Sequence, residues 1–136
     1  MNKVLVLCTG NSCRSIMAEA LINQFRSDHY HAVSAGSSPT GFVHPKAVET
    51  LQRHGIEAGH YESKSWDVFA GQSFDYVITV CDAAANEICP VFPGAYVKLH
   101  WSLVDPARIL GAEADVNAAF EAAYMILKEK IQETFT

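Results

Sequence analysis

The sequence contains no long apolar run and no excess of basic residues, and each absence excludes a class of function. No stretch of roughly 18 or more apolar residues occurs, which is about the length that a membrane-spanning helix needs. No basic segment followed by an apolar one opens the chain, so we predict neither a membrane partner nor a secretion signal, and we expect a cytoplasmic protein. Ten Lys and Arg stand against 15 Asp and Glu, a net charge of −5, which argues against a nucleic-acid partner.

The chain contains four cysteines in 136 residues and no secretion signal. This combination favours reduced thiols or redox chemistry over a structural disulfide framework. The length suits one domain over residues 1–136 with a real hydrophobic core, and we expect it to act as a monomer.

Short apolar runs and helical stretches alternate along the chain. Such alternation predicts an α/β fold, a three-layer sandwich in which helices cover both faces of a four-stranded parallel sheet. We expect strands at residues 3–7, 31–35, 75–80 and 96–99, and helices at 15–28, 44–54, 66–70 and 114–133.

The segment Cys-Thr-Gly-Asn-Ser-Cys-Arg-Ser, residues 8–15, joins the first expected strand to the first helix. Backbone N–H groups in such a turn, together with a helix N-terminus, form a cradle for an oxyanion, and the planar fork of Arg14 can hold two of its oxygens. The same field predicts a lowered pKa for the Cys8 thiol, which makes it a nucleophile, with Ser15 as a hydrogen-bond donor to the thiolate. A buried, inert cysteine is the alternative. The predicted oxyanion-binding residues are Thr9, Gly10, Asn11, Ser12, Cys13, Arg14 and Ser15.

Two further reactive residues follow expected strands. Cys81 comes directly after the third strand, and Asp105 lies in a loop soon after the fourth. Since ligands bind beyond the carboxyl ends of parallel strands, we expect both residues near Cys8. Asp105 could deliver a proton to a departing oxygen, or it could cap a helix that begins at Pro106.

Cys81 and Cys89 bracket a polar, alanine-rich segment. The two thiols could form a disulfide if this segment rearranges. A zinc site with His100 is a rival interpretation, although the spacing is not that of metal ligands and we predict no metal site. In the inert alternative, Cys81 ends a buried strand and Cys89 lies on the surface.

Five segments of the chain resemble arsenate reductases of the low-molecular-weight tyrosine-phosphatase type, in the branch that uses a thiol/disulfide relay. The matching stretches are CTGNSCRS at 8–15, SAGSSPTGFVHPKA at 34–47, SKSWDVF at 63–69, FDYVITVCDAAANEICPVFPG at 74–94 and HWSLVDPA at 100–107. The later cysteines and the CP-x-x-PG segment distinguish a reductase from a phosphatase. Phosphatases of this fold carry a pair of tyrosines near the Asp-Pro loop, and this chain has none there.

The resemblance implies a sequence of thiol reactions that detoxifies arsenate. Cys8 would attack arsenate held by the loop and Arg14, with Asp105 assisting the loss of water. Cys81 would then attack the Cys8 sulfur, which releases arsenite, and Cys89 would displace Cys8. The resulting Cys81–Cys89 disulfide would be reduced by an external dithiol system, thioredoxin or glutathione with glutaredoxin, so that no redox cofactor is bound.

The resemblance leaves three questions open. The Cys81–Cys89 spacing is one residue longer than in the common thioredoxin-coupled pattern, so the identity of the reductant stays open. Some relatives bind a potassium ion, and Asn11, Glu19 and Ser34 match that pattern while the remaining ligands do not. The alternative function is a tyrosine phosphatase that forms a cysteinyl-phosphate, and weak phosphatase activity is expected even of a reductase because the loop serves both reactions.

Overall fold

Four parallel strands form the sheet of the computed structural model, which describes residues 1–81 and 92–135. Their order across the sheet is β2-β1-β3-β4, and each neighbouring pair is parallel, as predicted. The bounds are Asn2–Cys8 for β1, Tyr30–Gly36 for β2, Tyr76–Thr79 for β3 and Val97–His100 for β4.

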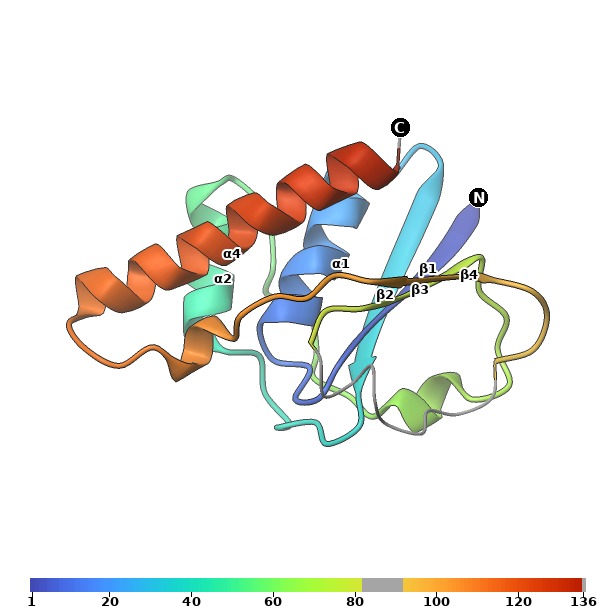
Figure 1. Ribbon diagram of the computed structural model, residues 1–136, viewed down its shortest axis with the longest axis horizontal. Helices are drawn as coiled ribbons and strands as arrows, with labels where there is room; N and C mark the ends of the chain where they lie inside the picture. Colours follow the sequence, from blue (N-terminus) through green and yellow to red (C-terminus); the bar gives the residue numbers. More distant parts are fainter. Residues whose placement is uncertain (82–91, 136) are drawn as a thin grey trace.

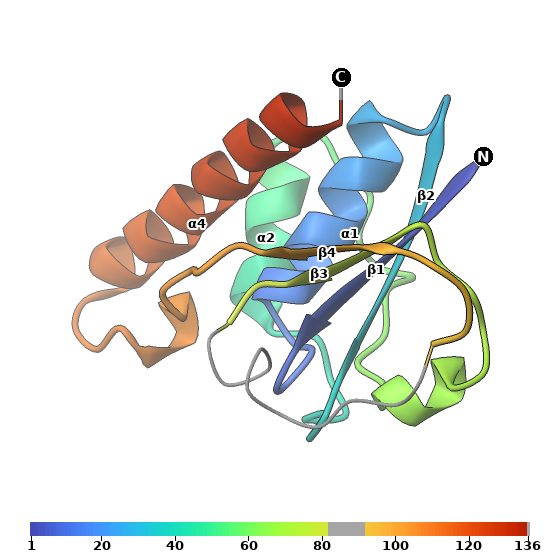
Figure 2. The same cartoon turned by 45° about the vertical axis from the view of Figure 1, so that its right-hand side comes forward.

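Helices cover the sheet unequally. Three α-helices gather on one side, and the short 3-10 helix η1 lies on the other (Figures 1 and 2). A second 3-10 turn, η2, precedes the last helix. The bounds are Arg14–Phe25 for α1, Pro45–Arg53 for α2, Trp66–Phe69 for η1, Pro106–Arg108 for η2 and Glu113–Thr134 for α4.

Strand β1 is apolar on both faces because both faces are covered. Val4 and Val6 belong to the larger core, with α1, α2 and α4, whereas Leu5 and Leu7 pack into a second core with Trp66 of η1. All four of these strand residues are buried. This is the pattern of a central parallel strand, and it confirms the prediction of helices on both faces.

Most element boundaries agree with the sequence prediction to within one or two residues. The first helix is the exception, since it ends at Phe25 and not at residue 28. The N–H groups of His29 and Tyr30 both bond the Arg26 carbonyl, forming a turn at Ser27 and Asp28, residue types that favour turns. One face of α4 is buried, and its residues are Phe120, Ala123, Tyr124, Leu127 and Ile131.

The strand order places the ends of β1 and β3 side by side. The chain runs from β1 outward to β2 and then returns to the other side of β1 with β3. Val80 N–H donates to the Leu7 carbonyl at 3.0 Å, which extends this pairing to the residue before Cys81. In an open parallel sheet this reversal of direction leaves a crevice at the carboxyl ends of the strands. Within the described residues, no helix is long and apolar enough to cross a membrane.

Candidate active site

The loop between β1 and α1 is held from outside by the segment that follows β2. Ser38 N–H donates to the Thr9 carbonyl at 2.9 Å, Thr40 N–H to Gly10 at 3.0 Å, and His44 N–H to Ser12 at 2.8 Å. Three carbonyl groups of the loop are thus hydrogen-bonded to the segment that surrounds it. The backbone turns at Asn11, whose φ of 45° is one that asparagine tolerates better than most residues. The segment 36–44 therefore supports the oxyanion cradle.

Gly36 is required where this segment starts. A Cβ atom at this position would lie 2.7 Å from the Cys8 carbonyl oxygen and closer still to that of Thr9. The Gly36 N–H also donates to the Lys64 carbonyl at 2.9 Å. Only a residue without a side chain lets β2 approach the loop so closely.

The sulfur of Cys8 is buried at the bottom of the loop. Its Sγ lies 2.9 Å from Ser15 Oγ and 3.2 Å from the Asn11 N–H, so the predicted contact with Ser15 is present. Burial raises the pKa of the Cys8 thiol, while the hydrogen bonds from Ser15 and Asn11 act in the opposite direction. The predicted lowering of this pKa is therefore wrong for the free protein, because the loss of solvation outweighs the donors.

Asn11 sets the direction of a buried chain of hydrogen bonds behind the sulfur. Its Oδ1 accepts from Lys64 N–H at 2.9 Å, so its Nδ2 points inward and donates to Ser15 Oγ at 2.8 Å and Ser34 Oγ at 3.0 Å. Ser34 in turn donates to Glu19 Oε1 at 2.6 Å. Because Ser15 accepts from Asn11, its own hydroxyl proton is free to point at Cys8.

Cys13, at the N-terminus of α1, is buried in the larger core. Its Sγ lies 3.5 Å from Asp105 Oδ1. Burial and the nearby Asp105 carboxylate raise the pKa of the Cys13 thiol to about 12. This thiol therefore stays protonated and donates to Asp105, and it is not a second nucleophile.

Arg14 and Asp105 face each other across the mouth of the site. Arg14 Nη1 donates to the Leu103 carbonyl at 2.8 Å, and its Nη2 lies 3.6 Å from Asp105 Oδ2. The buried Nε of Arg14 has no hydrogen-bond partner among the described residues. Asp105 accepts from Ala107 N–H at 3.0 Å, so it caps η2, which is the alternative to a proton-donor role that the sequence offered. It also lines the cleft.

A cleft of about 620 Å³ opens above the loop. Cys81 lines it together with Thr9, and the two side chains are 3.6 Å apart. Three of the predicted catalytic residues, Arg14, Cys81 and Asp105, thus share one cleft beside Cys8. Cys89, the fourth cysteine, lies outside the described residues, and so does any pairing with it.

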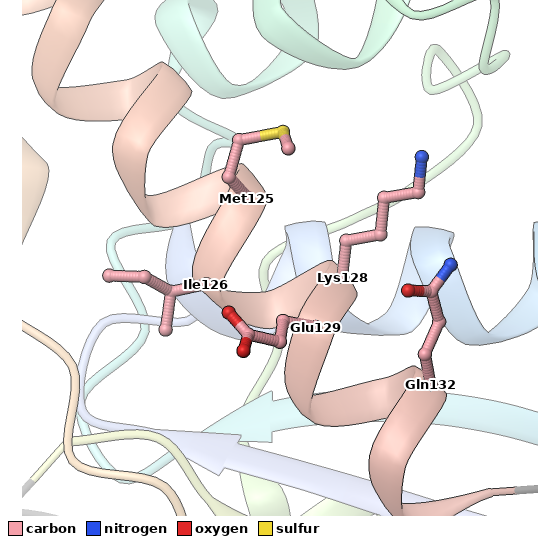
Figure 3. A pocket seen from close by; sticks show the side chains of 5 residues that line it. All are labelled: Met125, Ile126, Lys128, Glu129 and Gln132. Carbon is pink, nitrogen blue, oxygen red and sulfur yellow. The ribbon is translucent and has the colours of Figure 1, made fainter.

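Another hollow, of about 300 Å³, lies on α4 away from this cleft. Figure 3 shows that all of its side chains rise from that single helix, from Met125 to Gln132. No cysteine, serine or histidine is among the residues that line it. The candidate active site is therefore the cleft at the strand ends, which gathers the predicted residues Arg14, Cys81 and Asp105.

Sequence reasoning missed several residues of the site. Ser38 and Thr40 line the cleft, and Arg108 Nε lies 3.8 Å from Asp105 Oδ2. Lys64 was missed as well, although Ser38, Thr40 and Lys64 all belong to segments that match the family. None of these residues belongs to a motif that predicts a site residue, because the conformation of a loop or turn brings each of them to the site.

Comparisons with known proteins agree with this geometry. The model of the family described as low molecular weight phosphotyrosine protein phosphatase matches residues 3–135. The chain is 38% identical over 122 residues to an arsenate reductase of Halalkalibacterium halodurans, covering 88% of this chain and 86% of that protein. It superposes with a TM-score of 0.78 on an arsenate reductase in a phosphate-binding state, at 25% identity, covering 98% of this chain and 95% of that one. A thioredoxin-dependent arsenate reductase of Corynebacterium glutamicum gives a TM-score of 0.68 at 27% identity, covering 98% of this chain and 63% of that one.

Proposed function

This chain belongs to the low molecular weight phosphotyrosine protein phosphatase family. Because its relatives in that family include an arsenate reductase that is 38% identical to it, we propose that it is an arsenate reductase. The observation that carries the proposal is the second thiol in the cleft. Cys81 lies 3.6 Å from the side chain of Thr9, the residue after Cys8. Phosphate-ester hydrolysis needs one sulfur nucleophile, whereas reduction of arsenic(V) needs a second thiol to supply the electron pair.

The first step binds arsenate in the loop of residues 8–15. The positive charge of Arg14 has to leave Asp105 and the Leu103 carbonyl and turn toward the anion. The buried Arg14 Nε gains a partner in that movement, which favours it. Loop N–H groups bind the remaining oxygens.

Cys8 then forms a bond to arsenic while one oxygen departs as water. In the free protein the raised pKa keeps a proton on Cys8, and the departing oxygen needs a proton. The proton lost by the thiol balances the one gained by this oxygen, and Asp105 at the cleft carries it between the two. Ser15 stabilises the sulfur as it becomes negative.

The redox step joins two sulfurs. Cys81 attacks the Cys8 sulfur, a disulfide forms, and the sulfur–arsenic bond breaks with its electron pair on arsenic. Arsenic(V) thereby becomes arsenic(III) and leaves as arsenite. Cys89 next attacks Cys81, releases Cys8 as a thiol and leaves a Cys81–Cys89 disulfide.

An external dithiol protein reduces that disulfide, and we propose thioredoxin, because the Corynebacterium glutamicum relative is a thioredoxin-dependent arsenate reductase. The relay requires a reducing compartment, which fits the expected cytoplasmic location. Glutaredoxin with glutathione is the competing donor, and parallel assays with each reductant separate the two.

The decisive experiment measures two reactions on the same variants. Arsenate-dependent oxidation of reduced thioredoxin should be lost in Cys8→Ser, Cys81→Ser and Cys89→Ser. Aryl-phosphate hydrolysis should be weak, should survive in the latter two variants, and should be lost in Cys8→Ser. Mass mapping after a single turnover without reductant should find the Cys81–Cys89 disulfide.

Two outcomes would contradict the reductase. Strong phosphatase activity with no arsenate-dependent thiol oxidation would assign a phosphatase. Tight oxyanion binding without turnover of either substrate would make the chain a binding module.

A further inference from the structure

Behind the Cys8 loop, a buried carboxyl and a lysine line the same hollow. Glu19 on α1 is 6% exposed, and its Oε1 accepts from Ser34. Lys64 lies on the segment after α2, and both residues line a hollow of about 220 Å³ at the β2 edge of the sheet. The positive charge of Lys64 lowers the pKa of Glu19, opposing the burial that raises it to about 7.

Lys64 is connected once to the loop and once to the segment 36–44 that supports it. Its backbone N–H fixes the amide of Asn11, and its carbonyl accepts from Gly36 N–H. Its Nζ donates to the Glu62 carbonyl at 2.8 Å. The other titratable groups at this hollow are His31, His60, Tyr61 and Glu62.

The residues that match the potassium pattern do not fit a bound cation here. Asn11 presents its NH₂ group to Ser34, and an NH₂ group repels a cation. The Asn11 oxygen points the other way, to Lys64 N–H, and the Ser34 proton is donated to Glu19. A lysine ammonium acting on the same carboxyl would repel a second positive charge.

We propose that Lys64 supplies the positive charge opposite the buried Glu19 carboxylate, so that an internal charge pair supports the Cys8 loop without a bound potassium ion. Lys64 and Glu19 are positioning residues. They act on Cys8 through Ser34, Asn11 and Ser15, and this support is the same whichever oxyanion binds in the loop.

The test compares wild type with Lys64→Met, Glu19→Gln and the double variant, and Lys130→Met on the exposed end of α4 is the matched control. The readout is the rate of Cys8 alkylation above neutral pH, followed by mass mapping of the labelled peptide. A lone Glu19 carboxylate disfavours the Cys8 thiolate and a lone Lys64 ammonium favours it. Lys64→Met should therefore slow labelling roughly threefold, Glu19→Gln should speed it by a similar factor, and the double variant should return close to wild type.

A purely structural role would slow labelling in both single variants, and that result would overturn the proposal. So would a Lys64→Met variant that behaves like Lys130→Met. Unfolding temperatures verify that each variant is folded.

The ion comparison needs no variant. At equal ionic strength, the unfolding temperature and the Cys8 labelling rate of wild type should be the same in potassium chloride and choline chloride, because a bound ion would stabilise the folded state. A rise specific to potassium, saturating with its concentration, would refute the internal charge pair. Since the readouts are labelling and unfolding, neither depends on arsenate turnover.

Discussion

The back of the Cys8 loop and the mouth of the cleft are constructed in opposite ways. At the back, Asn11, Ser15 and Ser34 are fully buried, and each has hydrogen-bond partners. At the mouth, Arg14 and Asp105 keep 13% and 24% of their side chains exposed and pair across 3.6 Å. The back is complete before an anion arrives, whereas the charges at the mouth neutralise each other until it does.

This difference assigns distinct roles to the two regions. Donors that are already fixed need no reorganisation during the reaction, which is how a preorganised site lowers a barrier. The mouth has to exchange the partners of Arg14 for the anion. Changes at the back should therefore act on stability and on Cys8 reactivity, and changes at the mouth on turnover.

The largest effect is expected at the mouth, from Arg14→Lys. Lysine keeps the charge but loses the fork that holds two oxygens, so kcat/KM should fall about 100- to 1,000-fold. The unfolding temperature should change little. Steady-state kinetics with arsenate and with an aryl phosphate measure the loss.

Arg53→Lys is the matched control, because Arg53 lies on α2 outside the cleft, is 39% exposed and pairs with Glu49 at 3.3 Å. It should change kcat/KM by less than about threefold. An Arg14→Lys variant as active as this control would mean that Arg14 stays with Asp105 during turnover.

The next largest effect is expected from Gly36→Ala, which disrupts the packing behind the loop. The new Cβ meets the backbone carbonyl oxygens of Cys8 and Thr9, which cannot move aside without distorting the loop. We expect a loss of about 3 kcal/mol in the free energy of unfolding, measured by denaturant titration. Gly59→Ala is the control, since its Cβ would meet only the flexible end of Glu57. Equal stability of the two variants would contradict the close approach of β2.

The pH dependence of stability tests the role of Glu19 behind the same loop. The folded-state pKa of Glu19 is about 7, above its ordinary 4.5, because burial disfavours the charge. The folded protein thus holds this proton more tightly than the unfolded chain, and the resulting stabilisation is fully present below about pH 4.5 and lost as the pH rises through about 7.

Glu19→Gln cannot ionise and should keep that stabilisation. Its advantage over wild type should grow from near zero at about pH 4.5 to on the order of 3 kcal/mol at about pH 8. Glu49→Gln, on the exposed face of α2, is the matched control. A constant difference across this range would mean that Glu19 ionises as it does in the unfolded chain.

The sequence predicted the parts of this comparison that depend on local pattern. The apolar run of β1 and the meeting of Cys8 and Cys81 at the strand ends follow from periodicity and the rules of parallel sheets. The Ser15 contact follows from the chemistry of the oxyanion-binding loop. The role of segment 36–44 could not be predicted, because it depends on backbone hydrogen bonds between distant loops. The sign of the Cys8 pKa shift was also wrong, since a motif shows the donors of a site but not how deeply the fold buries it.

The smallest expected effect isolates one hydrogen bond at the back. Ser15→Ala removes the hydroxyl that lies 2.9 Å from the Cys8 sulfur and leaves one N–H of Asn11 without its acceptor. A hydrogen bond to a charged group is worth about 1.5 kcal/mol, so Cys8 alkylation should slow roughly tenfold at neutral pH. Ser102→Ala, at an exposed position, should label at the wild-type rate. If Ser15→Ala labels at that rate too, the backbone N–H of Asn11 alone stabilises the thiolate. The hydrogen bonds that run from Lys64 through the Asn11 side chain to Ser15 would then have no effect on the sulfur.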